Sequence, residues 1–430
     1  MWTKLFYILA TFQIIFAKHG FGPTDQDWGH IAARDGAYIF WWLHYTTANV
    51  TNYADKPLII WLQGGPGSSS TGYGNFAELG PLDVDLKPRG TSWVQWANIL
   101  FVDNPVGTGF GYVEDNSLLA KSNTEIAKDF LVFLKGFLDK VPIFKGVPMY
   151  IFCESYGGKM TAEIALIIDE ARRKNEIDAN LKGIGLGDSW ISSGDSILGY
   201  APFLYSLGRI DKDGYNQIIK VAKEIKSYLN KNESLDAEQL WGTVNEAVFD
   251  STYGIDSYNI LTKIAPETAG KNYLSRGGLY HLTDDEETKL LAVMNDKVKP
   301  ALNLTQTWSD GNGEIYQALI SDFMSPVTTI VERLLNETDM TVAVYNGQLD
   351  FIVDTPGTYS WVENLHFDGK QLWEAASRNG FDVNGYYEGY VKKYGKFAFY
   401  WVDRAGHMVP KDNPSAMYYI LKDVTNNFKI

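Results

Sequence analysis

The 430-residue sequence holds a single cysteine, Cys153, which excludes an intramolecular disulfide. A chain of this length can bury enough apolar surface to fold without covalent cross-links. A basic excess is also missing, because 52 acidic residues outnumber 38 basic ones and the formal net charge is −14. Nucleic acid binding, which needs a basic surface, is therefore not expected. Neither His-Glu-x-x-His nor a Cys/His cluster with zinc-ligand spacing is present, so we predict no metal ion and no other cofactor.

Long hydrophobic runs are absent after the N-terminus, where no segment reaches the ~20 apolar residues that cross a bilayer. At the N-terminus itself, Lys4 precedes an apolar stretch that ends at the small residue Ala17. This stretch is too short for a membrane anchor and is typical of a signal peptide cleaved near Ala17. Residues 1–17 are therefore predicted to be removed, and the mature chain to be secreted or lysosomal without a membrane span.

What the sequence does contain is ample material for a packed core, with 45% hydrophobic and 14% aromatic residues. It also contains Asn-x-Ser/Thr sequons, which behind a signal peptide predict glycosylated surface loops. The sequons are at Asn49, Asn232, Asn303 and Asn336.

Six short apolar runs predict buried parallel strands, because they are continuous rather than alternating and so fit a sheet covered on both faces. The runs are Leu58–Leu62, Ile99–Val102, Met149–Cys153, Gly183–Leu186, Thr341–Tyr345 and Phe397–Trp401. Helical patterns lie between them, at Thr124–Lys140 (with a capping box of Ser122 and Glu125), Lys159–Lys174 and Asn413–Phe428. The alternation predicts an α/β fold with a mostly parallel sheet and helices on both faces.

One long segment breaks this alternation. Residues 192–322 carry helical signals and few strand runs, and we predict that they form a helical cap inserted over the carboxyl edge of the sheet. The core would then consist of residues 18–191 and 323–430.

A serine nucleophile is indicated where the apolar run ending at Cys153 leads directly into Ser155 and a helical pattern follows. This is the context of a nucleophile elbow, a tight strand-to-helix turn that exposes a hydroxyl. Gly157 would relieve crowding beneath the turn, whereas Cys153 replaces the first glycine of Gly-x-Ser-x-Gly. The alternative is a plain Ser-Gly turn without a catalytic role.

A serine needs a general base, and in this context the acid and the base follow later in the order Asp, His. Asp350 and His407 each follow a predicted strand, so both belong to loops at the carboxyl edge of the sheet, where active sites gather. Asp354 and Asp403 are alternative acids, and we favour Asp350 because its loop fits the topology. For His407 the alternative is a structural histidine.

Two glycine-rich segments have different interpretations. Gly64-Gly65-Pro66-Gly67 follows a strand and predicts an oxyanion hole, whose second donor follows the nucleophile. A phosphate-binding loop is the alternative, but no Gly-Lys-Ser/Thr follows. The run Gly107–Gly111 is only a weak dinucleotide signal.

Taken in order, these segments resemble the serine carboxypeptidases from about Asp27 to the C-terminus. The matching pieces are Gly64–Gly67, Glu78–Pro81, Asp103–Phe110, Glu154–Gly158, Gly187–Asp188 and Ala405–Pro410. Trp61–Gly65, Leu186–Ser192 and Tyr345–Asp354 are most similar to the retinoid-inducible branch. The resemblance implies an α/β-hydrolase fold with Ser155 as nucleophile, His407 as base and Asp350 as the orienting carboxylate. It also implies that the backbone N–H groups of Gly65 and Tyr156 form the oxyanion hole.

The resemblance further implies a subsite for the terminal carboxylate of a substrate, formed in the family by two glutamates and an asparagine. Glu78 and Glu154 match the glutamates, and Gln63 stands at the asparagine position. Two close carboxylates tend to share a proton, since both cannot ionise cheaply, and the protonated group can then donate to the ligand. Activity is therefore expected to be best in acid, with a titration that belongs to the pair.

The sequence thus predicts a serine-type carboxypeptidase that hydrolyses the C-terminal bond of peptides or proteins through an acyl-enzyme. One alternative is an acyltransferase or esterase on the same scaffold. Another is a non-catalytic binding or stabilising partner. Glu78 and Glu154 favour peptide substrates, and the complete set of catalytic residue types weighs against a purely non-catalytic role.

Overall fold

The computed structural model describes residues 19–264, 284–309 and 313–425, so the predicted signal peptide at 1–17 lies outside it, as does the C-terminal end of the predicted helix Asn413–Phe428. Within these residues one 11-stranded sheet has the order β1-β2-β4-β3-β6-β7-β8-β11-β10-β9, and β5 pairs with β2. The strands are β1 (Gln26–Arg34), β2 (Ala37–His44), β3 (Leu58–Leu62), β4 (Asn98–Asp103), β5 (Tyr112–Val113), β6 (Pro148–Glu154), β7 (Asn180–Gly187), β8 (Thr341–Gly347), β9 (Asn379–Val383), β10 (Tyr386–Tyr394) and β11 (Phe397–Val402).

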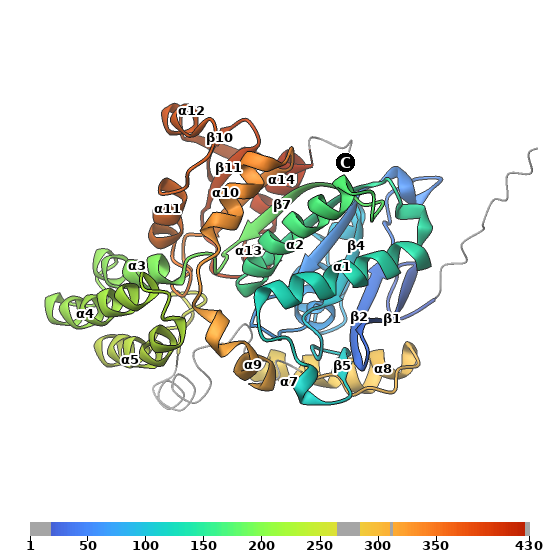
Figure 1. Cartoon of the computed structure of the whole chain (residues 1–430), viewed down its shortest axis with the longest axis horizontal. Helices are drawn as coiled ribbons and strands as arrows, with labels where there is room; N and C mark the ends of the chain where they lie inside the picture. The colour runs from blue at the N-terminus through green and yellow to red at the C-terminus, as the bar shows by residue number, and fades with distance from the viewer. Residues whose placement is uncertain (1–18, 265–283, 310–312, 426–430) are drawn as a thin grey trace, which may run out of the picture.

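Helices flank this sheet (Figure 1). They are α1 (Asn123–Lys140), α2 (Tyr156–Arg173), α3 (Ser193–Ser206), α4 (Lys212–Leu229), α5 (Ser234–Thr252), α7 (Asp284–Ala292), α8 (Lys299–Ala301), α9 (Gly313–Phe323), α10 (Thr328–Glu337), α11 (Thr355–Glu363), α12 (Lys370–Ala375), α13 (Val409–Asp412) and α14 (Pro414–Val424). A π-helix, η2 (Ser70–Leu79), follows the glycine-rich loop after β3. None of the described helices has both the length and the apolar character of a transmembrane span.

The six predicted strands are all present, as β3, β4, β6, β7, β8 and β11, and they form one parallel block. Antiparallel strands extend the sheet on both sides of this block. The apolar-run pattern did not predict β10, because only two of its residues are buried and those at its two ends are exposed. Strand β2 is also apolar and almost fully buried, yet it pairs antiparallel with β4. A continuous apolar run therefore indicates a strand covered on both faces but not whether the strand is parallel or antiparallel.

The central strands are apolar throughout because each contributes to two cores. In β3 the even-numbered residues pack in the cluster beneath α1 and α2, which lie in front of the sheet in Figure 1. The odd-numbered residues pack in a second cluster that includes the apolar face of α14. Successive side chains point to opposite faces of a strand, so a strand covered on both sides needs apolar residues at every position.

The predicted helices are confirmed with shifted ends. At the start of α1, Ser122 Oγ accepts a hydrogen bond from Glu125 N at 3.3 Å. The Glu125 carboxylate accepts from Lys121 N at 2.8 Å rather than from Ser122, so the predicted capping box is half formed. Helix α2 begins at Tyr156, earlier than predicted, because it starts immediately after the turn at Ser155.

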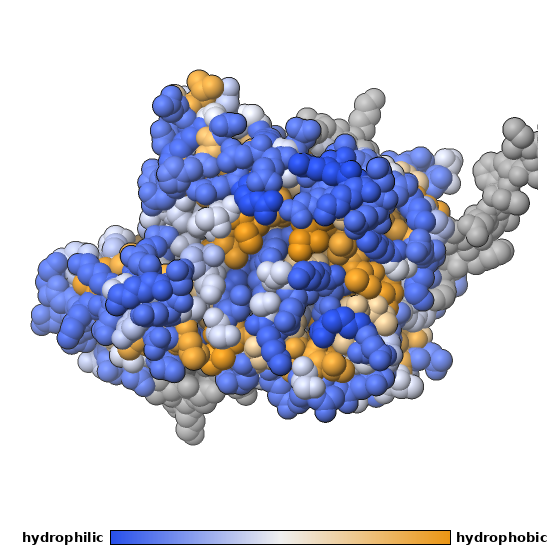
Figure 2. Space-filling view, in the orientation of Figure 1, coloured by the Kyte–Doolittle hydropathy of each residue, from blue (hydrophilic) through white to orange (hydrophobic). Residues whose placement is uncertain are grey.

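The segment 192–322 is helical, and no strand occurs among its described residues. Helices α3, α4 and α5 pack side by side at one end of the molecule, and α7, α8 and α9 lie along its lower side in Figure 1. Helix α3 also packs against α11, which lies outside the predicted insertion. The division into core and cap stays a prediction. The face in Figure 2 is mostly hydrophilic, including the surface of α4 and α5.

A buried cation ties the end of this segment to the first turn of α2. The side chain of Lys159 is only 1% exposed, and its Nζ lies 2.8 Å from Asp322 Oδ2. Nζ also donates to the Ser325 carbonyl oxygen at 2.9 Å. The Tyr156 hydroxyl donates to the same Asp322 carboxylate at 3.3 Å. The return from the helical segment is therefore fixed next to Ser155.

Removing this cation is expected to destabilise the fold. Breaking a buried ion pair from one side costs roughly 3–5 kcal/mol, because the remaining polar groups lose their partner. We expect Lys159→Met to lower the free energy of unfolding in urea by about 3 kcal/mol. The matched control is Lys223→Met, at an exposed position of α4, which should change stability by less than about 0.5 kcal/mol. Equal stability of the two variants would contradict the role of Lys159.

Candidate active site

Ser155 occupies the sharp turn between β6 and α2. Its backbone has φ +61° and ψ −128°, a conformation that an L-residue adopts only under strain. Ser155 N donates to the Gly187 carbonyl oxygen at 3.1 Å, which holds the turn against β7. The neighbours Glu154 and Tyr156 are buried, whereas Ser155 is partly exposed. The turn therefore presents one hydroxyl at the carboxyl edge of the sheet.

Glycines allow two backbones to approach this turn. A Cβ at Gly157 would lie 2.5 Å from the Leu62 carbonyl oxygen, so the space beneath the elbow admits no side chain there. A Cβ at Gly64 would lie 2.6 Å from Ser155 Cβ and 2.8 Å from Tyr156 N. The glycine-rich loop after β3 is thus in direct contact with the elbow.

This contact brings two candidate oxyanion donors to one place. Tyr156 is the first residue of α2, so its N–H has no partner within the helix and lies at the positive end of the helix dipole. Gly65, at φ +107°, directly follows Gly64, whose backbone contacts the turn at Ser155. Backbone N–H groups arranged in this way can stabilise negative charge that develops on an oxygen.

The buried carboxylate of Asp103 organises the loop from behind. It accepts hydrogen bonds from Ser69 Oγ at 2.7 Å and from Thr71 N at 3.0 Å. It also accepts from Phe110 N at 3.1 Å, and a Cβ at Gly109 would lie 2.2 Å from its Oδ2. Gly109 therefore lies directly against this carboxylate, where no side chain would fit.

His407 and Asp350 lie in contact in the loops after β11 and β8. His407 Nδ1 is 2.7 Å from Asp350 Oδ2, and both side chains are fully buried. The carboxylate favours the tautomer with hydrogen on Nδ1, which leaves the lone pair on Nε2. Burial lowers the pKa of His407 to about 3, so the imidazole stays neutral in mild acid and can accept a proton. The Tyr258 ring packs edge-on against the imidazole with centroids 4.6 Å apart.

The two alternative acids have other surroundings. Asp354 caps α11, since its Oδ1 accepts from Gly357 N at 2.8 Å. Asp403 is partly exposed and lines a hollow of about 560 Å³ together with Arg378 and Arg404. The contact with His407 thus belongs to Asp350.

A second acidic group lies beside the elbow. Glu78, near the end of η2, and Glu154, the residue before Ser155, are each 1% exposed, and their carboxyl groups lie close enough to affect each other's protonation. Gln63 Nε2 donates to Glu154 Oε1 at 3.0 Å. Trp61 Nε1 donates to Gln63 Oε1 at 2.7 Å. Because an indole N–H can only donate, Trp61 determines which end of the Gln63 amide faces the glutamates.

The environment of this pair favours a shared proton. Burial raises the pKa of Glu78 to about 7, although the nearby polar groups of Glu154 and Gln63 act in the opposite direction. Burial also raises the pKa of Glu154 well above its ordinary value, and the charge of Glu78 adds to that shift. In mild acid at least one of the two is therefore protonated and can donate to an anionic ligand.

A family model described as serine carboxypeptidase matches residues 19–427 of the chain. The chain belongs to the serine carboxypeptidase family. Its relatives include the retinoid-inducible serine carboxypeptidase of Rattus norvegicus, 42% identical over 98% of this chain and 97% of the relative. The Homo sapiens protein of the same name is 40% identical over 94% and 92%. Serine carboxypeptidase-like 51 of Arabidopsis thaliana is 34% identical over 94% and 92%. The resemblance to the family and to its retinoid-inducible branch is confirmed.

The fold of this serine carboxypeptidase also matches a solved structure. Kex1(delta)p, a prohormone-processing carboxypeptidase from Saccharomyces cerevisiae, superposes with a TM-score of 0.80 at 23% identity. The match covers 94% of this chain and 92% of that one. The predicted α/β-hydrolase fold is thereby confirmed.

Three residues of this site carry no sequence signal that predicts their role. Trp61 belongs to a predicted strand, yet its indole orients Gln63. Tyr258 lies in the helical segment and carries no motif, yet its carbonyl oxygen accepts from His407 N at 2.7 Å. Asp188 was noted only as part of a matching piece, although its position directly after β7 is the kind of strand-end position that supplied the other candidates.

All four sequon asparagines are exposed, as glycosylation would require, and their modification stays a prediction. Asn336 differs from the other three, because its Nδ2 donates to the His366 carbonyl oxygen at 3.1 Å and its Oδ1 accepts from Asp368 N at 2.8 Å.

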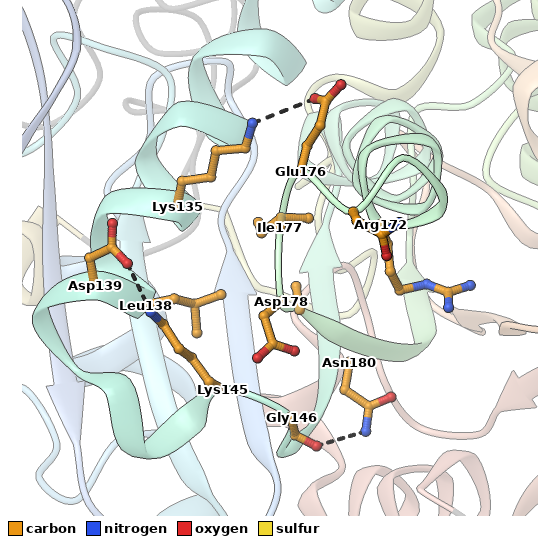
Figure 3. A pocket seen from close by; sticks show the side chains of 12 residues that line it. Lys135, Leu138, Asp139, Lys145, Gly146, Arg172, Glu176, Ile177, Asp178 and Asn180 are labelled. Carbon is orange, nitrogen blue, oxygen red and sulfur yellow. Dashed lines mark hydrogen bonds and ion pairs between the residues drawn. The ribbon is translucent and has the colours of Figure 1, made fainter.

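A polar hollow of about 700 Å³ lies away from the elbow (Figure 3). Gly146, just before β6, and Asn180, the first residue of β7, line it, so it is at the amino edge of the sheet. Two pairs of its charges lie in contact, Lys145 with Asp139 at 2.9 Å and Lys135 with Glu176 at 3.7 Å. The hollow therefore has no part in the site at Ser155.

Proposed function

We propose that this member of the serine carboxypeptidase family removes single residues from the C-termini of peptides or proteins and works best in acid. The observation that carries the proposal is the position of the Glu78–Glu154 pair directly beside Ser155. In a peptide, three bonds separate the terminal carboxyl carbon from the carbonyl carbon of the last peptide bond. A subsite that holds the terminal carboxylate next to the nucleophile thus selects that bond over internal ones.

The proposed chemistry is acyl transfer. The Ser155 hydroxyl attacks the last peptide carbonyl while His407 Nε2 accepts its proton. The N–H groups of Gly65 and Tyr156 stabilise the tetrahedral oxyanion. Collapse breaks the C–N bond, and the imidazolium returns the proton to the departing amine. Water, deprotonated by His407, then hydrolyses the ester and regenerates Ser155.

The proposed place of action is the secretory pathway, with the mature protein secreted or lysosomal. The signal-peptide pattern at 1–17 and the exposed sequons support this location. An acidic compartment would also keep the Glu78–Glu154 pair protonated.

The test measures free amino acid released from N-blocked dipeptides at pH 5 and pH 7.5. We expect release at pH 5 that Ser155→Ala lowers by at least roughly 10⁴-fold, because the nucleophile is lost. Ser117→Ala, at an exposed position, is the matched control and should remain fully active. The same dipeptides with an amidated C-terminus should be poor substrates.

Two outcomes would contradict the proposal. Equal hydrolysis of free and amidated dipeptides would remove the role of the terminal carboxylate. Cleavage of esters without peptide hydrolysis would instead favour an acyltransferase or esterase.

A further inference from the structure

A third buried carboxyl lies behind the Asp350–His407 pair. Asp188 is fully buried and has φ +39°, an unfavourable backbone conformation for a residue with a side chain. Its backbone N–H donates to the Tyr345 carbonyl oxygen at 2.9 Å, and its Oδ1 accepts from Gly347 N at 2.8 Å. These bonds fix Asp188 between β7 and β8, at the start of the loop that carries Asp350.

Asp188 is also in contact with the site itself. Its side chain lies close to that of Asp350. One side-chain atom of each of Asp188, Asp350 and His407 lies within 4.8 Å of the other two. Two buried carboxyls in contact cannot both be ionised cheaply, so a proton must lie between them.

The surroundings decide which carboxyl carries that proton. Asp350 faces the His407 imidazole at 2.7 Å and accepts from Val353 N at 3.2 Å, and both contacts favour its ionised form. Apart from the neutral His407 imidazole, the described groups that act on Asp188 are the carboxyls of Asp350 and Asp412 and the Gly347 N–H, none of which is a cation. Burial raises the pKa of Asp188 well above its ordinary value, and the charge of Asp350 adds to that shift. Burial also raises the pKa of Asp350 well above its ordinary value, but the backbone N–H groups of Val353 and Ile352 and the nearby Asp188 carboxyl act to lower it.

We infer that Asp188 is a positioning residue, which as a neutral carboxylic acid donates its O–H to Asp350 and holds that carboxylate against His407. The inference rests on the proposed catalytic roles of Ser155, Asp350 and His407. It assigns Asp350 two fixed partners, one on each side, so that the imidazole keeps its orientation when it becomes charged during the reaction.

This arrangement predicts a pH effect on kcat. Loss of the Asp188 proton at alkaline pH would place a second negative charge beside Asp350 and push the two carboxylates apart. Several other titratable groups lie near Asp188, Asp350 or their neighbours, namely Asp256, Asp354, Asp412, Glu154, Tyr258, Tyr345 and His407. Of these, Glu154 belongs to the proposed carboxylate subsite and should act mainly on KM. A blocked amino acid p-nitrophenyl ester, which has no terminal carboxylate, separates the two effects.

The experiment compares Asp188→Asn and Asp188→Ala with the wild type on this ester from pH 5 to pH 8.5. Asparagine keeps a donor toward Asp350 and cannot ionise. We expect Asp188→Asn to retain kcat within about threefold at pH 5 and to keep it at alkaline pH, where the wild type declines. Alanine removes the donor and should lower kcat by roughly 10–100-fold, the size typical of losing a partner that orients a functional group. Asp178→Asn, at an exposed position on the opposite edge of the sheet, is the matched control.

Several results would overturn the inference. An Asp188→Asn enzyme that is folded by thermal melting but as impaired as Asp188→Ala would exclude the donor role. If kcat of Asp188→Asn declines at alkaline pH as much as kcat of the wild type, loss of the Asp188 proton is not the cause of the decline. Inactivation of the wild type by EDTA would indicate a cation, rather than a proton, between the carboxyls. Ester hydrolysis that survives Ser155→Ala would instead contradict the proposed role of Ser155. This result distinguishes failure of the proposed function from failure of the Asp188 inference.

Discussion

Replacing Asp350 by asparagine is expected to lower kcat by roughly 10⁴-fold, the size seen when the acid of such a triad is changed to an amide. The carboxylate accepts from His407 Nδ1 at 2.7 Å and so keeps the lone pair on Nε2. An amide can present its NH₂ to Nδ1 instead, which favours the opposite tautomer and leaves Nε2 unable to accept the serine proton. The measurement is kcat for an N-blocked dipeptide at pH 5, with thermal melting to verify the fold.

Two matched variants test whether the effect is specific to this carboxylate. Asp354→Asn should retain near wild-type kcat, because asparagine also serves as a helix N-cap. Asp403→Asn, at a partly exposed position, should also change kcat by less than about threefold. A loss of ~10⁴-fold in Asp354→Asn together with an active Asp350→Asn would transfer the role of the acid to Asp354.

The second large effect concerns the pH dependence of KM for substrates with a free C-terminus. Burial raises the pKa of Glu78 to about 7 and that of Glu154 well above its ordinary value, so the pair is fully protonated in acid and begins to lose protons near pH 7. The ionised pair repels the terminal carboxylate of the substrate. Because binding requires a proton that the free enzyme loses above pH 7, we expect KM to rise about tenfold per pH unit above that pH. The pair should have little effect on kcat.

The double variant Glu78→Gln/Glu154→Gln removes this titration. We expect its KM for the dipeptide to vary by less than about threefold from pH 5 to pH 8, because neither amide ionises. Glu246→Gln, at an exposed position of α5, should keep the wild-type profile. A wild-type KM that does not change over this range would show that the pair does not bind the terminal carboxylate.

Local sequence patterns were sufficient for the parallel part of the sheet. The run Leu58–Leu62 became β3 with unchanged ends, because a strand covered by helices on both faces has no polar positions to interrupt it. The same pattern does not predict β10, because the residues at both of its ends are exposed and only two residues in its middle are buried. A strand of this kind is selected by its pairing with its neighbours β11 and β9 rather than by its own apolar content.

The sequence predicts the candidate catalytic residues as far as they are marked by their position relative to the strands along the chain. Ser155 had to follow a strand and precede a helix, and His407 had to follow the last strand of the parallel block. The choice between Asp350 and Asp354 could only be ranked, since both belong to one loop. The tertiary structure separates them, because the chain turns between them and Asp354 points to the start of α11.

The sequence by itself determined the fold class, the family and the residue types available for catalysis, since these depend on local periodicity and on motifs whose order along the chain is specific. Only the tertiary structure decided how the buried polar groups combine. Trp61 orients Gln63, and Asp188 contacts Asp350 from a different strand. Such contacts join residues far apart in the chain, and their energies depend on burial and distance, which no pattern along the sequence records.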